Sequence, residues 1–243
     1  MHVDYTSTYS VPISCETCTS EISTALSTLE SVTSITYNIP SKLVHITGSA
    51  PPSSIIPKIQ STGRTAILRG SGRSNTAAVC ILEVPWQQGL EEKVEGKTVR
   101  GLMRLIELKE GVTLCDLSVT GMPPRGRYIA SVRVSGDVSG GRTKMGSLFH
   151  GSEGKREARI GEIAVDEGGR GAFVGEIGWN VWEMVGRGFL VEKEGGGGKG
   201  KDEAVMGVIA RSAGVWENDK VVCSCTGKTL WEEREEMVGK GIL

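Results

Sequence analysis

Residues 10–31 read SVPISCETCTSEISTALSTLES and join a short strand signal to a helix signal through two cysteines. The strand is predicted from Ser10 to Ile13. Apolar side chains then recur at i, i+3, i+4 and i+7, which predicts an amphipathic helix over residues 18–31. These side chains belong to Ile22, Ala25, Leu26 and Leu29. The pair Cys15-x-x-Cys18 therefore lies where a strand ends and a helix begins.

The sequence that follows completes one small domain. Alternating apolar residues predict two strands, and a short helix with Ser53 as its expected N-cap and a last strand come after them. These elements are expected at residues 35–39, 44–46, 53–63 and 64–69. The order strand, helix, strand, strand, helix, strand is that of a ferredoxin-like α+β (βαββαβ) domain. We place this domain at residues 1–72.

A second domain of a different kind follows Gly70–Ser74, whose composition is that of a linker. Short β-rich runs alternate with Gly-rich turns up to residue 210, and they predict an all-β sandwich or barrel over residues 73–210. The expected strands are residues 77–84, 98–108, 113–119, 128–134, 158–165, 171–177, 188–192 and 205–210. Residues 211–243 are polar and are predicted to form a short mobile tail.

Composition narrows the function classes. The chain has 243 residues, 38% hydrophobic residues and a net charge of −1, which suits a globular protein without a strong phosphate-binding surface. We therefore expect no nucleic-acid partner. No apolar run reaches the length of a membrane span, and Met1–Asp4 does not begin a secretory signal. We expect a cytoplasmic protein, in which tight cysteine pairs indicate metal or redox sites before structural disulfides.

Cys15 and Cys18 have the stronger of the two cysteine signals. A helix N-terminus favours negative charge and therefore thiolates, and two thiolates on a surface loop suit a soft ion of low coordination number such as Cu(I). The alternatives are a thioredoxin-type dithiol, which needs a different order of elements, and a structural disulfide. His45 is expected to be a half-exposed strand residue without a role as a ligand.

Cys223 and Cys225 form a second pair, in the polar tail. Two thiols this close bind Cu(I) or exchange disulfides, and the alternative is a pair of unreactive surface thiols. Cys80 and Cys115 lie in apolar strand runs, and they are expected to be small buried residues.

With these residues in view, the chain resembles the copper chaperones for superoxide dismutase, in their fungal form. The CxxC domain is similar to domains of the heavy-metal-associated type. Two further runs carry the resemblance, GVIARSAGVWEN at residues 207–218 and CSCTGKTLWEER at residues 223–234. Residues 99–102, 136–141 and 186–191 are similar to Cu/Zn superoxide dismutase, which implies a Greek-key β-sandwich for the middle domain.

The middle domain departs from that enzyme at the positions where the resemblance places its metal ligands and its disulfide. The whole chain has three histidines, and only His150 aligns with a ligand position. The other aligned positions hold Ser131, Val132 and Arg133, Trp182, Arg159 and Glu162, and Arg142 and Met206. The resemblance therefore implies a docking domain without a dismutase Cu/Zn site. In the copper loop, Ile13 stands where methionine is common, and we expect it to fill the same packing role.

The resemblance implies a metallochaperone that is not itself an enzyme. Cys15, Cys18, Cys223 and Cys225 would bind Cu(I), and Gly207, Val208, Ile209 and Ala210 would help to dock a Cu/Zn superoxide dismutase subunit as a heterodimer. Further implied partners are a second copy of the chain and a membrane copper transporter as donor. Implied further compartments are the mitochondrial intermembrane space and the nucleus. The alternatives are a thiol oxidoreductase, a dismutase, and a copper buffer or sensor without a dedicated client.

Overall fold

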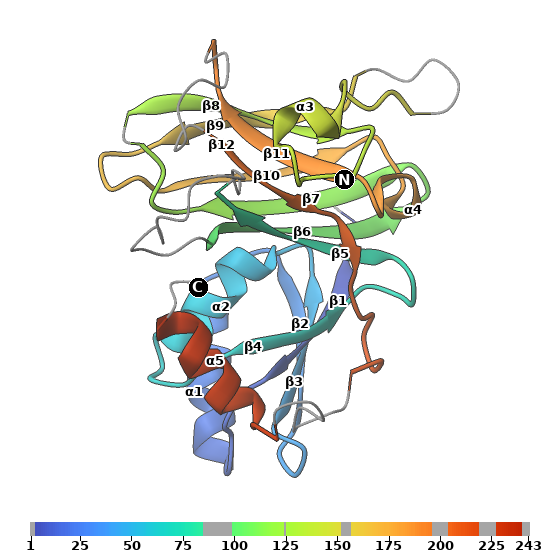
Figure 1. The fold of residues 1–243 in the computed structure, drawn as a ribbon. Coiled ribbons are helices and arrows are strands. Elements are labelled where there is room, and N and C mark those ends of the chain that lie inside the picture. Colours follow the sequence, from blue (N-terminus) through green and yellow to red (C-terminus); the bar gives the residue numbers. More distant parts are fainter. Residues whose placement is uncertain are drawn as a thin grey trace.

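The first sheet along the chain has four antiparallel strands in the order β2-β3-β1-β4 (Figure 1). This is a computed structural model, which describes residues 3–84, 99–123, 125–151, 157–195, 204–218 and 227–239. The elements of the first domain are β1 (Tyr5–Ser10), α1 (Glu16–Leu26), β2 (Val32–Asn38), β3 (Leu43–Gly48), α2 (Pro52–Gln60) and β4 (Ile67–Ser71). The predicted βαββαβ order is confirmed.

The core of this domain lies between the two helices and one face of the sheet. Ile22 and Leu26 of α1 and Ile55 and Ile59 of α2 are buried, as the helical periodicity predicts. The observed helices begin earlier than predicted. The N-cap of α2 is Pro51 instead of Ser53, because Pro52 fits the first turn of a helix, where its missing N–H is not needed.

In the ranges that the structure describes, the second domain is one antiparallel sheet of nine strands, which curls into a nearly closed barrel-like sandwich. The strand order is β10-β7-β6-β5-β12-β11-β8-β9, and β13 pairs with β5. The strands are β5 (Ala77–Glu83), β6 (Val99–Lys109), β7 (Val112–Val119), β8 (Gly126–Arg133), β9 (Arg159–Val165), β10 (Gly171–Ile177), β11 (Gly188–Lys193), β12 (Ala204–Val208) and β13 (Ala210–Arg211). All eight predicted strand regions are confirmed, and the last divides at Ile209 into two strands.

Three helices complete the described chain. Two are single turns in the barrel, α3 (Arg142–Met145) and α4 (Val181–Met184), and the third is α5 (Leu230–Gly239) near the C-terminus (Figure 1). Thr229 and Glu232 cap α5, because the Thr229 amide donates to Glu232 Oε2 at 2.7 Å. Within the ranges that the structure describes, no helix is long and apolar enough to cross a membrane.

The connection between the two domains differs from the prediction. Gly70 and Ser71 of the expected linker belong to β4 and are buried. Residues 212–218, which were expected to belong to a mobile tail, pack against both sheets. The Ala213 carbonyl, for example, accepts a hydrogen bond from the Ser71 amide. Linker composition describes local chain preferences, and here contacts from residues about 140 positions away in sequence override them.

The two domains also meet through buried groups. The Asp116 carboxylate of β7 is fully buried and accepts a hydrogen bond from the Ser53 amide at the start of α2 at 3.0 Å. Tyr5 of β1 packs with Ile106 and Leu114 of the barrel. A carboxylate at a helix N-terminus is favourable, so Asp116 stabilises α2 from the neighbouring domain.

Candidate metal-binding site

The cysteine loop is held by the end of the four-stranded sheet. After β1 the Val11 amide donates to the Lys42 carbonyl at 2.9 Å, and Ile13 is buried in the domain core. The expectation that Ile13 packs beneath the loop is confirmed. Cys15 is the N-cap residue of α1 in an extended conformation, and Cys18 lies in the first helical turn. The strand and the helix therefore place both cysteines at one exposed end of the domain.

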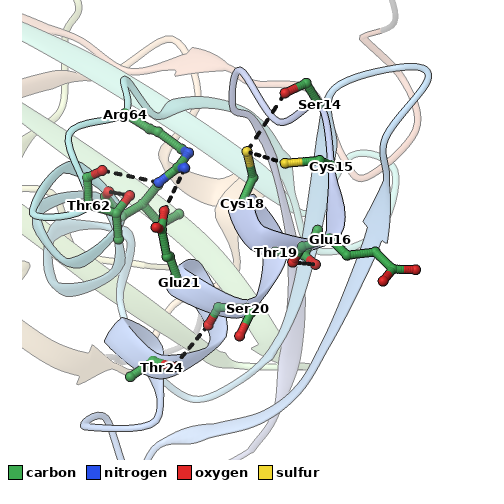
Figure 2. Close-up of polar contacts among 11 residues, drawn as sticks. Ser14, Cys15, Glu16, Cys18, Thr19, Ser20, Glu21, Thr24, Thr62 and Arg64 are labelled. Carbon is green, nitrogen blue, oxygen red and sulfur yellow. Dashed lines mark hydrogen bonds and ion pairs between the residues drawn. The ribbon is translucent and has the colours of Figure 1, made fainter.

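The two sulfur atoms face each other (Figure 2). Cys15 Sγ and Cys18 Sγ are 3.4 Å apart, and Ser14 Oγ lies 3.8 Å from Cys18 Sγ. Both cysteines are free thiols. Two unbonded sulfur atoms that already lie close together can bind one soft ion with little change of the loop. Thiolate ligands favour soft metal ions, and Cu(I) is one of these.

Hydrogen bonds at this end of the domain favour the thiolate form of Cys18. A hydrogen bond from the Ser14 amide, with smaller contributions from the Cys15 thiol, the Arg64 guanidinium and the Ser14 hydroxyl, lowers the pKa of Cys18 to about 6. Cys18 is therefore mostly a thiolate at neutral pH, which is the form that binds a metal.

Arg64 is a site residue that no pattern in the sequence singled out. Its guanidinium points toward Cys18 in Figure 2, while its Nη2 lies 2.6 Å from Glu21 Oε2 and its Nη1 donates to the Thr62 carbonyl at 3.1 Å. These two partners hold the positive charge beside the sulfur atom. Arg64 lies 46 residues beyond Cys18 in sequence, so only the packing of α1 beside the end of α2 brings the two together.

His45 is not the half-exposed residue that was predicted. Its side chain is only 7% exposed, its Nδ1 lies 2.9 Å from Thr8 Oγ1, and its ring centroid is 4.0 Å from that of Trp216. Strand neighbours Val44 and Ile46 face the core, so His45 lies on the opposite face of the sheet. The prediction failed because the covering residue comes from position 216.

The two isolated cysteines differ from the exposed pair. Cys80 and Cys115 are 1% and 0% exposed, which confirms their prediction as buried residues. Burial raises the pKa of Cys80 to about 12 and also raises the pKa of Cys115. A buried thiol that keeps its proton is inert toward metals.

An ion pair occupies the region where the resemblance to Cu/Zn superoxide dismutase predicts paired strand ligands. Arg133 Nη2 donates to Glu192 Oε1 at 2.7 Å, and Arg142 Nη1 lies 2.9 Å from Glu192 Oε2. Arg133 is buried, whereas Trp182 is 64% exposed.

No group of three or more His, Cys, Asp or Glu side chains suited to a metal occurs in the described ranges. His150 is exposed and Ser131 is buried, while Arg159 and Glu162 contact Glu157 and Arg127 respectively.

The predicted docking residues are not equally accessible. Val208 is 40% exposed and Ala210 is exposed, whereas Ile209 is buried in the barrel core. Gly207 allows close strand contact, since a Cβ there would lie 2.0 Å from the Ile81 carbonyl oxygen. Ile81 of β5 and Val134 after β8 are exposed apolar residues that the sequence did not single out. Cys223 and Cys225 lie outside the described residues, between Asn218 and Gly227.

Comparisons with known proteins agree over both parts of the chain. The heavy-metal-associated domain family matches residues 8–65. A superoxide dismutase 1 copper chaperone from Saccharomyces cerevisiae is 36% identical over 98% of this chain and 97% of its own length. One from Kluyveromyces lactis is 37% identical over 98% of this chain and 96% of its own length. A copper chaperone for superoxide dismutase from Mus musculus is 28% identical over 96% of this chain and 90% of its own length.

Proposed function

The chain belongs to the family of superoxide dismutase copper chaperones, and on this premise we propose that it captures Cu(I) on Cys15 and Cys18 and delivers the ion to a Cu/Zn superoxide dismutase. The observation that carries this proposal is the pair of exposed sulfur atoms 3.4 Å apart, with the pKa of Cys18 lowered to about 6. The copper ion is the cargo of the protein, so the site must both bind it and release it.

The exposed position of the thiol pair supports transfer by ligand exchange. An incoming thiolate joins the ion before a resident thiolate leaves, so the ion is never free in solution. Cys15 is exposed and Cys18 is half-buried at the end of the domain, which leaves room for an incoming donor or acceptor. A membrane copper transporter with a thiol site is our proposed donor.

The barrel would recognise the client. Exposed apolar side chains of Ile81, Val134 and Val208 lie on β5, after β8 and on β12, and Ile81 and Val208 are on neighbouring strands. Ile81 and Val208 are thus exposed apolar side chains on paired strands, and exposed apolar side chains that lie together are typical of protein interfaces. A client with a related sandwich can form a heterodimer there, in place of the contact that two copies of this chain would make.

The second cysteine pair would complete the delivery. Cys223 and Cys225 would relay copper and, when joined as a disulfide, would assist the client by thiol exchange. A client thiolate attacks one sulfur atom, a mixed disulfide forms, and the other tail cysteine leaves as a thiolate. A second client thiolate then attacks the mixed disulfide, so the client gains the disulfide and both tail cysteines are left reduced.

The barrel would not itself catalyse superoxide dismutation. Arg133 places a buried positive charge, paired with Glu192, where the resemblance to Cu/Zn superoxide dismutase predicts a copper ligand. A guanidinium cannot donate an electron pair to a metal. We therefore propose a metallochaperone that is not an enzyme, present in the cytoplasm and, in part, in the mitochondrial intermembrane space and the nucleus. Fractionation of cells that produce the tagged chain tests the compartments.

The decisive experiment measures activation of an apo, disulfide-reduced Cu/Zn superoxide dismutase by the copper-loaded chain. Wild type is compared with Cys223→Ser/Cys225→Ser, with Cys15→Ser/Cys18→Ser and with Cys115→Ala as the control. We expect activation by wild type and the control, and loss in the tail variant. Tight Cu(I) binding without any activation by wild type would leave a copper buffer or sensor, and thiol exchange with general substrates would instead favour an oxidoreductase.

A further inference from the structure

Residues 212–218 lie along the outer edge of β4, the edge strand of the four-stranded sheet. The Ser71 amide donates to the Ala213 carbonyl at 3.2 Å, and the Val215 amide donates to the Gly72 carbonyl at 3.0 Å. An edge strand offers unpaired backbone groups, and this segment satisfies two of them. The segment that precedes the CxC pair is therefore bound to the domain that carries Cys15 and Cys18.

The approach of the two backbones is close enough to require glycine on both sides. A Cβ at Gly70 would lie 2.1 Å from the Gly214 carbonyl oxygen, and a Cβ at Gly214 would lie 2.8 Å from the backbone of Arg73. No side chain can occupy such a space without displacing one backbone. The sequence has glycine at both positions, so the contact matches the residues that form it.

Arg69 and Asn218 fix the far end of this segment. Arg69 Nε and Nη2 donate to the Asn218 carbonyl at 3.1 and 2.7 Å, and Nη2 also donates to Asn218 Oδ1 at 3.2 Å. Arg69 is a buried residue of β4. A charged donor that makes a forked contact with one residue gives both strength and a defined geometry.

Trp216 covers the outer face of the sheet from a strained backbone. Its φ is +71°, a region that bulky residues rarely adopt, and its ring lies against the His45 ring, with 4.0 Å between the centroids and 36° between the ring planes. Such a conformation persists only where surrounding contacts hold it. The Glu217 Oε2 atom accepts the Gly214 amide at 2.7 Å and closes this turn. The indole is nevertheless 70% exposed, so it can be replaced without opening the core.

The residues just before this segment belong to the barrel. Ala210 and Arg211 form β13, which pairs with β5, and the Ser212 amide donates to the Ala77 carbonyl at 3.0 Å. Nine consecutive residues are thus bound first to one sheet and then to the other. A segment that binds both domains limits their relative rotation.

We propose that residues 212–218 are a clasp that fixes the CxxC domain on the barrel and sets the point from which the CxC segment leaves, with Trp216 and Arg69 as its positioning residues. The clasp runs from Ser71 toward Arg69, and this is the direction of the Ser10 end of β1, after which the CxxC loop begins. Its role in copper delivery rests on the function proposed above, whereas the clasp itself does not.

The test compares full-length wild type with Trp216→Gly, Trp216→Phe and the control Trp182→Ala, which removes a comparably exposed indole from the barrel. Glycine relieves the strained φ at position 216 but also frees the backbone of the open segment, so Trp216→Phe, which keeps an aromatic ring on the original backbone, identifies the part of any loss that is due to the ring. Protection of the Ser71 and Val215 amides from hydrogen exchange is measured first. We expect protection to fall about 5-fold in Trp216→Gly, as for loss of one aromatic stack, and to stay at the wild-type value in the other two variants.

The same four proteins, loaded with equal copper, are then assayed for the rate of transfer to the apo client. We expect Trp216→Gly to transfer about 5-fold more slowly at unchanged copper loading and Trp216→Phe to restore the rate. Unchanged amide protection in Trp216→Gly would overturn the clasp. Lower protection with a wild-type transfer rate would overturn its positioning role. If wild type transfers no copper, the delivery function fails, and the exchange data still decide on the clasp.

Discussion

The exposed cysteines of the CxxC domain and the buried cysteines of the barrel have the same side chain and opposite chemistry. Cys18 receives a hydrogen bond from the Ser14 amide and lies near Arg64, and its pKa is lowered to about 6. Cys80 and Cys115 lie inside an apolar core, where burial raises the pKa of both thiols. The difference shows that the end of a strand and the start of a helix make a thiol reactive, whereas a strand interior makes it inert.

The largest expected effect is the loss of copper binding when the exposed pair is removed. In a Cys223→Ser/Cys225→Ser background, the Cys15→Ser/Cys18→Ser substitutions should lower Cu(I) affinity by at least about 100-fold. Loss of a residue that only hydrogen-bonds a metal ligand already lowers metal affinity by about 10- to 100-fold, and here both ligands are lost. Anaerobic competition with a chromophoric Cu(I) chelator measures this affinity. Cys80→Ala in the same background should bind copper as well as its parent does. Equal losses in both would abolish the contrast between the two regions.

A comparable effect is expected for thiol reactivity. In the folded protein, iodoacetamide should modify Cys18 at least about 100-fold faster than Cys115 at neutral pH, because only an accessible thiolate reacts. The rate at Cys18 should rise with pH through about 6, where its thiol loses the proton. Mass spectrometry of peptides from quenched samples measures both rates. Denaturant should remove the difference, and comparable rates without denaturant would contradict the assignment.

A third prediction tests how much Arg64, as distinct from the start of α1, contributes to the lowered pKa of Cys18. The Arg64→Gln substitution should raise the pKa of Cys18, because the guanidinium contributes to its lowering. At pH 6 the alkylation rate of Cys18 should then fall about 3-fold, as for loss of one nearby charge near the surface. The control is Arg125→Gln, whose guanidinium contacts Glu167 on the barrel. If Arg64→Gln leaves the pH profile unchanged, the helix end alone determines the reactivity of Cys18.

The last prediction concerns His45, a titratable group buried on the outer face of the same sheet. Burial lowers the pKa of His45 below its ordinary value, so at a pH between the two values the unfolded chain binds a proton that the folded chain does not. The free energy of unfolding should therefore fall as pH drops below about 6.5, by at most about 1.4 kcal/mol for each pH unit.

Urea unfolding at several pH values compares wild type with His45→Phe, which keeps an aromatic ring against Trp216. The contribution of His45 is the difference between the two pH slopes. A slope that is the same in both proteins would show that His45 is protonated in the folded state as easily as in the unfolded chain.

Much of the architecture follows from local sequence patterns. The helical spacing of Ile22 and Leu26, and the alternation along the strands of both domains, depend on neighbours within one element. The proposed copper pair also follows from sequence, because Cys15 and Cys18 lie together at one helix start. The contacts between the two domains were less predictable from sequence. Asp116 of the barrel, for example, contacts the start of α2 in the other domain.

Local sequence patterns were enough to predict the two domain types and the thiol pair, because each depends on residues close together along the chain. By contrast, the packing of distant elements brings Arg64 beside Cys18, Trp216 over His45 and Asn218 to Arg69. These partners are 46, 171 and 149 positions apart in sequence. Their contacts depend on how whole elements pack, and no local pattern of charge or hydrophobicity records that packing.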